Sequence, residues 1–234
     1  MLMRSKLLIA ACSVAFSIHG QKLASNSPSE AFIKLTQWHD SLANVDNTGL
    51  YEGELYPTVS RSRYSHQFFN SRNWFTGKLI FKGSWYFEVP MVFDAVSQRL
   101  ILKHPDLARR DGIALPMEFI SEFHLHDHRF VTIDDLGAYD LLYDGTVISL
   151  LCERKKEEKT EDGGTVYEED DGYFLYDKTS ATLGKFKGKK DLGRFSENSK
   201  GLTQGLKQKG IKLKMSDESS MIRFIQNFDL ALNE

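Results

Sequence analysis

The stretch GKLIFKGSWYFEVPMVFD, residues 77–94, decides the fold that this sequence predicts. Its second half alternates in polarity, and one side of it carries Trp85, Phe87, Val89, Met91 and Phe93. A period of two with one wholly apolar side is typical of a strand half-buried against a core. Lys82-Gly83 is typical of a tight turn, so the two halves are predicted to pair as an antiparallel hairpin. Pro90 has no N–H to donate, which predicts either an edge strand or a bulge.

Short segments of the same kind continue to about residue 187. Asp144-Gly145 repeats the hairpin signal, and the further predicted strands cover residues 100–103, 118–125, 130–133, 139–143, 146–153, 166–176 and 181–186. Short turns without helical crossovers predict antiparallel meanders. We therefore predict an α+β fold, mainly antiparallel β, with a meandering sheet rolled into an open barrel or a sandwich.

Helical patterns flank the predicted sheet. Ser27-Pro28-Ser29-Glu30 is a capping box with Pro at the first helical position. An apolar stripe at helical spacing follows it, formed by Phe32, Leu35, Trp38 and Leu42. These features predict one N-terminal helix over residues 28–43. Two or three more helices are predicted over about residues 189–234, where apolar residues again recur at helical spacing.

Composition places the chain among ordinary globular proteins. The 234 residues are 41% hydrophobic and 26% charged, with a net charge of −2. No basic field points to nucleic acid, so a nucleic-acid partner is not expected. No Pro-rich or Ser-rich linker interrupts residues 21–234. We therefore predict that these residues form a single β-rich domain.

The first twenty residues predict export. Arg4 and Lys6 precede an uncharged apolar run over residues 7–18, and a small residue precedes Gln21. This is the pattern of a secretory signal peptide over residues 1–20, cleaved after Gly20. The run is shorter than the ~20 residues of a spanning helix, and no later stretch approaches that length. The expected location is therefore the periplasm, the outer membrane as an associated protein, or the extracellular space. Lipid attachment at Cys12, with cleavage before it, is the less favoured alternative.

A histidine-rich stretch, FHLHDH over residues 123–128, is the strongest candidate for metal chemistry. Alternate residues of a straight strand share a face, and imidazole is a good zinc ligand. The favoured interpretation is different: Phe119, Ser121, Phe123 and Leu125 point inward, His124 lies outward beside Glu122, and His126-Asp127 forms a turn. No cofactor is then expected. If zinc does bind, the candidate ligands are Glu122, His124, His126 and His128.

Aromatic residues crowd the segment over residues 64–93. Such residues mostly form cores, but exposed ones can stack on sugars or line an apolar pocket. Trp74 and Tyr86 lie off the predicted apolar face, and they are therefore the candidate ligand-binding residues.

Three features together resemble a family. GKLIFKG (77–83) followed by FEVPMVFD (87–94), then YFLYD (173–177) leading to KKDL (189–192), combine with a signal peptide that ends just before Gln21. This combination is similar to a family of secreted bacterial proteins of the Bacteroidetes type, whose function is unknown. The resemblance implies export and a domain of a sheet plus helices, and it brings no activity or catalytic residue.

Catalytic templates are missing from the sequence: there is no Gly-x-Ser-x-Gly elbow, phosphate loop, dinucleotide fingerprint or His-Glu-x-x-His pair. We therefore expect an exported, non-catalytic envelope or extracellular module with a binding or structural role. Two alternatives stay open. One is a metal-dependent hydrolase built on His124, His126 and His128. The other is a binder of a small ligand, sugar or lipid, with an aromatic-lined pocket.

Overall fold

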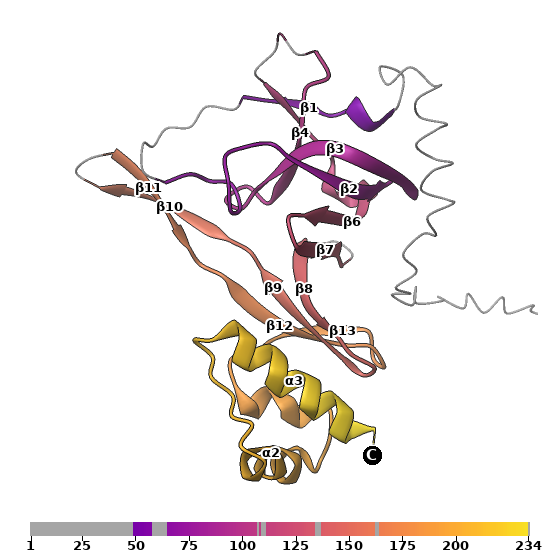
Figure 1. The fold of residues 1–234 in the computed structure, drawn as a ribbon, viewed down its shortest axis with the longest axis vertical. Coiled ribbons are helices and arrows are strands. Elements are labelled where there is room, and N and C mark those ends of the chain that lie inside the picture. Colours follow the sequence, from indigo (N-terminus) through magenta and orange to yellow (C-terminus); the bar gives the residue numbers. More distant parts are fainter. Residues whose placement is uncertain are drawn as a thin grey trace, which may run out of the picture.

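The computed structural model describes residues 49–57, 65–106, 108, 111–133, 137–161 and 164–233. Within them, a long series of antiparallel strands is followed by two α-helices (Figure 1). The predicted signal peptide, its cleavage site, Cys12 and the predicted helix over residues 28–43 lie outside the described residues.

Eleven strands form one sheet, in the order β1-β5-β4-β3-β2-β6-β7-β8-β9-β12-β13. The first five in this order are β1 (Glu54–Tyr56), β5 (Gly112–Ala114), β4 (Arg99–Lys103), β3 (Ser84–Asp94) and β2 (Phe75–Phe81). The other six are β6 (Ile120–Leu125), β7 (His128–Thr132), β8 (Ala138–Asp144), β9 (Ile148–Glu153), β12 (Gly172–Asp177) and β13 (Thr182–Lys185). A separate hairpin of β10 (Lys156–Glu161) and β11 (Gly164–Glu169) is inserted between β9 and β12. The helical elements are η2 (Gly49–Tyr51), η3 (Met117–Phe119), η5 (Lys189–Arg194), α2 (Ser199–Gln208) and α3 (Glu218–Leu232).

The predicted fold class is confirmed: every strand pair is antiparallel and the helices α2 and α3 come late in the chain. The sheet is not closed into a barrel, since β1 and β13 each pair with one neighbour only. Its twist nevertheless brings distant strands together. The N–H of Lys156, after β9, donates to the carbonyl of Ala95, after β3, at 3.0 Å, although four strands separate β3 from β9 in the sheet.

Two apolar clusters cover one face of the sheet. The first fills the curled half and contains Leu79, Met91, Phe93, Phe123 and Phe130, all buried. The second lies under the helices, where Met221, Phe224, Ile225 and Phe228 of α3 are fully buried with Ile148, Leu150 and Leu175 of the sheet. Burying one such side chain stabilises the fold by about 1.5–3 kcal/mol. Figure 1 shows α2 and α3 together at this end of the sheet.

Helix α3 is also fixed by one buried acid. Asp229 is 1% exposed. It accepts the backbone N–H groups of Thr146, Val147 and Ile148 at 2.7, 2.9 and 2.8 Å. These donors belong to the turn between β8 and β9, which the Asp144-Gly145 signal predicted correctly. Asp229 therefore anchors helix α3 to the sheet. With apolar contacts alone, these backbone N–H groups would lack hydrogen-bond acceptors.

The predicted apolar face of β3 is wrong in its first part. The register shifts between Gly77 and Leu79 of β2, because β3 contains one extra residue opposite this point. In this part of β3, Glu88 adopts a φ of 54°. This bulge, one of the two options that Pro90 predicted, reverses the alternation. Val89, Met91 and Phe93 face the first cluster as predicted. Trp85 and Phe87 instead lie on the opposite face, and Tyr86 packs against the cluster in their place.

Candidate functional site

A buried arginine joins three parts of the fold. Arg154 follows the last residue of β9, and its side chain is 10% exposed. Its guanidinium lies 2.7 Å from Asp140 of β8, 2.8 Å from Asp171 before β12 and 2.9 Å from Glu218, the first residue of α3. We call Arg154 and these three carboxylates the Arg154 cluster. Because its members come from the sheet, the base of the β10–β11 hairpin and a helix, the cluster holds these elements together.

The electrostatics of the cluster keep the arginine charged. Burial alone lowers the pKa of Arg154, but the hydrogen bonds to Glu218 and Asp171 and the charge of Asp140 outweigh it, so the pKa is raised. Asp140, with a side chain 2% exposed, is the deepest acid. A buried charge is tolerated only when it is paired and hydrogen-bonded in this way.

Asp140 also holds a histidine. Nδ1 of His128 lies 2.7 Å from Oδ2 of Asp140. The imidazole packs edge-on against Phe69, with ring centroids 4.9 Å apart and an interplanar angle of 89°. The guanidinium of Arg154 lies 5.8 Å from the same phenyl ring. His128 is therefore fixed by an acid and an aromatic ring, on the face of the sheet that carries the first cluster.

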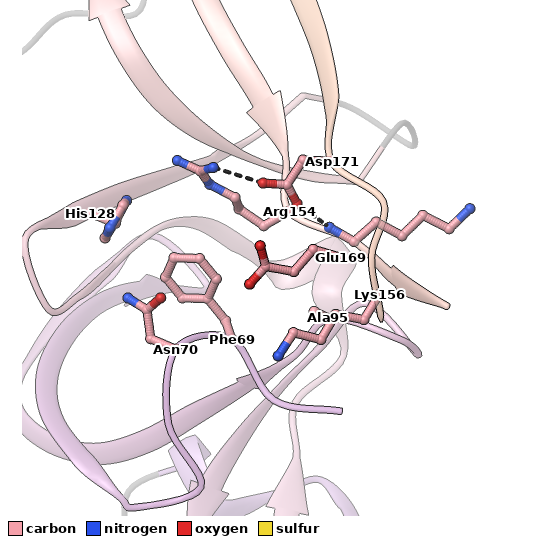
Figure 2. Close-up of a pocket in the computed structure, with 9 residues that line it drawn as sticks. Phe69, Asn70, Ala95, His128, Arg154, Lys156, Glu169 and Asp171 are labelled. Carbon is pink, nitrogen blue, oxygen red and sulfur yellow. Dashed lines mark hydrogen bonds and ion pairs between the residues drawn. The ribbon is translucent and has the colours of Figure 1, made fainter. Parts of the chain in front are cut away.

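Phe69, His128, Arg154 and Asp171 are among the residues that line a small pocket of about 140 Å³. Figure 2 shows the Arg154–Asp171 ion pair on one side, Phe69 and Asn70 on the other, and the carboxylate of Glu169 pointing into the space between them. The amine of Lys156 turns away and donates to the carbonyls of His66 and Phe68 at 3.2 and 2.9 Å. A water in the liquid takes up about 30 Å³, so the pocket has room for a few waters or one small polar molecule.

A second, larger cavity lies next to the first. It has a volume of about 330 Å³ and shares Lys155 and Asp171 with the first pocket. Its wall also contains Glu153, Asp170, Gly172, Tyr173, Phe174, Lys185, Phe186 and Lys187. Nζ of Lys185 lies 6.0 Å from the ring centre of Phe174, and the hydroxyl of Tyr173 donates to Glu218 at 3.3 Å. The volume lies within the range of about 300–1,000 Å³ found for small-molecule sites.

The structure brings only some of the predicted metal ligands together. Nε2 of His124 lies 2.6 Å from Glu122, which also accepts a hydrogen bond from Arg129 at 2.8 Å. These contacts lower the pKa of Glu122, although burial acts in the opposite direction. His126 lies in the turn with a φ of 55°, and its ring contacts that of Phe75 in a tilted arrangement, with centroids 4.1 Å apart and an interplanar angle of 36°. His128 points to the opposite face, as described above.

The predicted turn at residues 126–127 is confirmed, but His128 lies inward, against Phe69 and Asp140, and not on the surface of the hairpin. In the part of the chain that the structure describes, no group of three or more His, Cys, Asp or Glu side chains is placed to hold a metal ion. The predicted inward direction is right for Phe123 and Leu125 and wrong for Ser121 and Phe119. The reason is a register shift between β2 and β6, at Ile80 and Phe81, which turns Ser121 outward.

The two candidate aromatic residues lie on opposite faces of the sheet. Trp74 is half-buried against a cluster that contains Phe68, Val92 and Ile101, and Tyr86 is half-buried against the first cluster. The rings of Trp85 and Phe87 stack on each other at 5.7 Å and 12°. The bulge at Glu88 decides this outcome, because it exchanges the faces of residues 85–87.

The free thiol lies beside the Arg154 cluster. Cys152 is fully buried. Burial raises its pKa, and Arg154 offsets this only in part. Because the thiolate is the reactive form, burial keeps Cys152 unreactive in the folded protein.

The comparisons with known proteins add no relative: no protein-family model, no curated protein and no solved structure matches this chain. Among the described residues, no helix has the length and apolar character needed to cross a membrane.

Proposed function

We propose that the protein is an exported, non-catalytic envelope or extracellular module that works by binding. The observation that supports this proposal most is the pairing of charges at the smaller pocket, which His128, Arg154 and Asp171 help to line. Arg154 and its carboxylates are bonded to one another, and His128 is held by Asp140. Groups fixed in this way form a preorganised wall, which lowers the ordering entropy lost when a ligand binds.

The larger cavity favours a sugar over a lipid as the ligand. Its wall contains three lysines and three acids together with Tyr173 and Phe174. Sugar hydroxyls can accept from lysines and donate to carboxylates, while a sugar ring can lie against an aromatic side chain. An alkyl chain in the same place would desolvate these charges without pairing them. We therefore propose a mono- or disaccharide as the ligand of this cavity.

Native mass spectrometry and isothermal calorimetry with a panel of mono- and disaccharides, including galactose and N-acetylglucosamine, test this proposal. We expect one saccharide to bind with one-to-one stoichiometry. The double variant Lys185→Gln/Lys187→Gln removes two exposed amines from the rim and should abolish binding. The control variant Lys190→Gln, also exposed but away from the cavity wall, should bind normally. A panel without any binding saccharide, or binding unaffected by the double variant, contradicts the proposed ligand.

A metal-dependent hydrolase is the competing function, and metal analysis of the purified protein distinguishes the two. Stoichiometric zinc that is lost on His126→Ala would overturn the proposal of a non-catalytic module. A protein without stoichiometric zinc that still binds a saccharide supports it.

Export is a separate part of the proposal, supported by the sequence of residues 1–20. Expression of the full chain in a Bacteroidetes-type host, followed by fractionation and N-terminal sequencing, tests it. We expect the protein outside the cytoplasm with Gln21 as its first residue. A lipid-modified N-terminus that disappears on Cys12→Ser indicates the anchored alternative, and full-length protein retained in the cytoplasm contradicts export.

A further inference from the structure

The larger cavity lies over a row of residues that crosses three neighbouring segments of the sheet. Glu153 of β9 pairs with Gly172 of β12. The N–H of Phe186 donates to the carbonyl of Tyr173 at 2.8 Å, so the pairing with β12 continues past the end of β13 and places Lys187 opposite Gly172. Paired residues of neighbouring strands share a face of the sheet. Glu153 and Lys187 therefore lie on opposite sides of Gly172, with their backbones two strand spacings, about 10 Å, apart.

The next row supplies an aromatic ring and a second lysine. Phe174 lies two residues after Gly172, on the same face of β12, and pairs with Lys185 of β13. Gly172 leaves space beside this ring, because a Cβ atom at its position would lie 3.2 Å from Cε2 of Phe174 and 3.4 Å from Oε2 of Glu153. A larger side chain would fill the space between the acid and the lysines. The backbone of Gly172 therefore forms the base of the cavity at this point.

The charges over this base are divided between its two sides. Glu153 is the acid on the β9 side, and Lys185 and Lys187 are the bases on the β13 side. Within the described part of the chain, none of these three side chains forms an ion pair. Two amines and one carboxylate therefore face the cavity wall with their charges unpaired, which leaves an excess of one positive charge.

The other charges of the wall do not change this balance. Asp171 is paired with Arg154 at 2.8 Å, and Lys155 and Asp170 carry opposite charges. Beyond β13 the chain is strongly basic, since residues 185–194 contain five cations and one acid. The carboxylate of that acid accepts the N–H groups of the backbone at residues 187 and 188, at 2.6 and 3.0 Å. The β13 side of the cavity is therefore suited to an anionic group.

We propose that the larger cavity binds an acidic monosaccharide of the hexuronic acid class, an inference that rests on the saccharide proposed above. Lys185 and Lys187 bind the carboxylate of the sugar through charge-assisted hydrogen bonds. Glu153 accepts hydrogen bonds from hydroxyls on the opposite side of the ring. The ring itself lies over Gly172, beside Phe174.

The charge of the sugar distinguishes this class from its neighbours. A hexuronate carries one negative charge, which matches the excess of one positive charge in the wall. A neutral sugar would leave the two lysine amines without a counter-charge. A phosphorylated sugar would bring a charge of about −1.5 to −2, more than the wall can balance while Glu153 is ionised.

Isothermal calorimetry with two matched pairs of sugars tests the proposal: glucuronic acid against glucose, and galacturonic acid against galactose. We expect at least one acidic sugar to bind about tenfold or more tightly than its neutral counterpart, and this preference should shrink as the salt concentration rises. Neutral saccharides that bind alone, or as tightly as the acidic ones, overturn this inference and leave the saccharide proposal standing. If no saccharide of either kind binds, both proposals are wrong.

A matched pair of variants separates recognition of the carboxylate from general damage to the cavity. Lys187→Gln removes the charge and Lys187→Arg keeps it, so only Lys187→Gln should lose most of the preference for the acidic sugar. The ratio of the two dissociation constants is measured on one protein sample, so a partly unfolded variant does not alter it. Gly172→Ala should weaken the binding of the acidic and the neutral sugar alike, because its Cβ atom enters the space below the ring. Equal preferences in the two Lys187 variants, or unchanged binding in Gly172→Ala, contradict the proposed site.

Discussion

Replacing Arg154 by Met keeps most of the apolar stem and removes the guanidinium that joins three carboxylates. Asp140 is affected most, because its side chain is 2% exposed, whereas those of Asp171 and Glu218 are 23% and 33% exposed. Removing one partner of a buried pair costs about 3–5 kcal/mol, and partners in solvent contribute about 0–1 kcal/mol each. We therefore expect Arg154→Met to lower the free energy of unfolding by about 3–5 kcal/mol, a large share of the ~5–15 kcal/mol typical of a domain.

Urea unfolding followed by circular dichroism measures this loss. Arg129→Met is the matched control, since Arg129 is 26% exposed and its partner Glu122 is 14% exposed, so neither is as deeply buried as Asp140; its expected cost is smaller than that of Arg154→Met. Adding Asp140→Leu to Arg154→Met should restore part of the loss, because the uncompensated buried charge is then removed. If Arg154→Met costs no more than Arg129→Met, the reasoning is refuted.

The other predictions concern single residues. Asp229→Asn should lower the free energy of unfolding by about 2–4 kcal/mol in the same urea assay, because the buried acid accepts three backbone N–H groups; an unchanged midpoint contradicts this. Cys152 should resist iodoacetamide at pH 8 and react once urea unfolds the protein, because burial raises its pKa; rapid labelling of Cys152 in the native protein contradicts this. The folded-state pKa of Glu122 lies below its ordinary value of 4.5, so its ionised form stabilises the fold above that pH and the contribution disappears as the pH falls through the lowered pKa. Glu122→Gln should therefore destabilise the protein at pH 7 and have little effect near pH 3, and equal effects at both values contradict the ion pair. Glu88→Gly should leave stability unchanged or raise it by about 1 kcal/mol, because glycine adopts positive φ without strain; a loss above that size contradicts the bulge.

Hairpin signals and alternation were enough to predict antiparallel pairing. They did not give the strand order, since β2 pairs with β6, and they missed the strands β1, β5 and β10. Lys82-Gly83 and Asp144-Gly145 both form turns between paired neighbours. Pro90 left a bulge as one of two options for β3, but the position of that bulge at Glu88 and the bulge at Ser121 could not be predicted, because each lies at an ordinary residue. One extra residue exchanges the two faces of a strand, and for this reason the predicted faces of Trp85 and Tyr86 were reversed.

The Arg154 cluster was missed because its members are far apart in the sequence and lie on four different segments. Arg154 stands in a charged run that is typical of a solvated hairpin, and nothing in that run indicates burial. One signal was present: Asp140 is the one acid within the predicted strand over residues 139–143, and the structure shows that it is buried. A lone acid on an inward face predicts a buried cation nearby, although the sequence does not identify that cation.

A double-mutant cycle between Arg154→Met and Glu218→Gln tests most directly whether the Arg154 cluster joins the sheet to helix α3. Glu218 begins α3, and Arg154 follows β9. With the free energy of unfolding as the readout, we expect a coupling of about 1–3 kcal/mol between the two residues. A coupling indistinguishable from zero would mean that the helix and the sheet are held together without this ion pair.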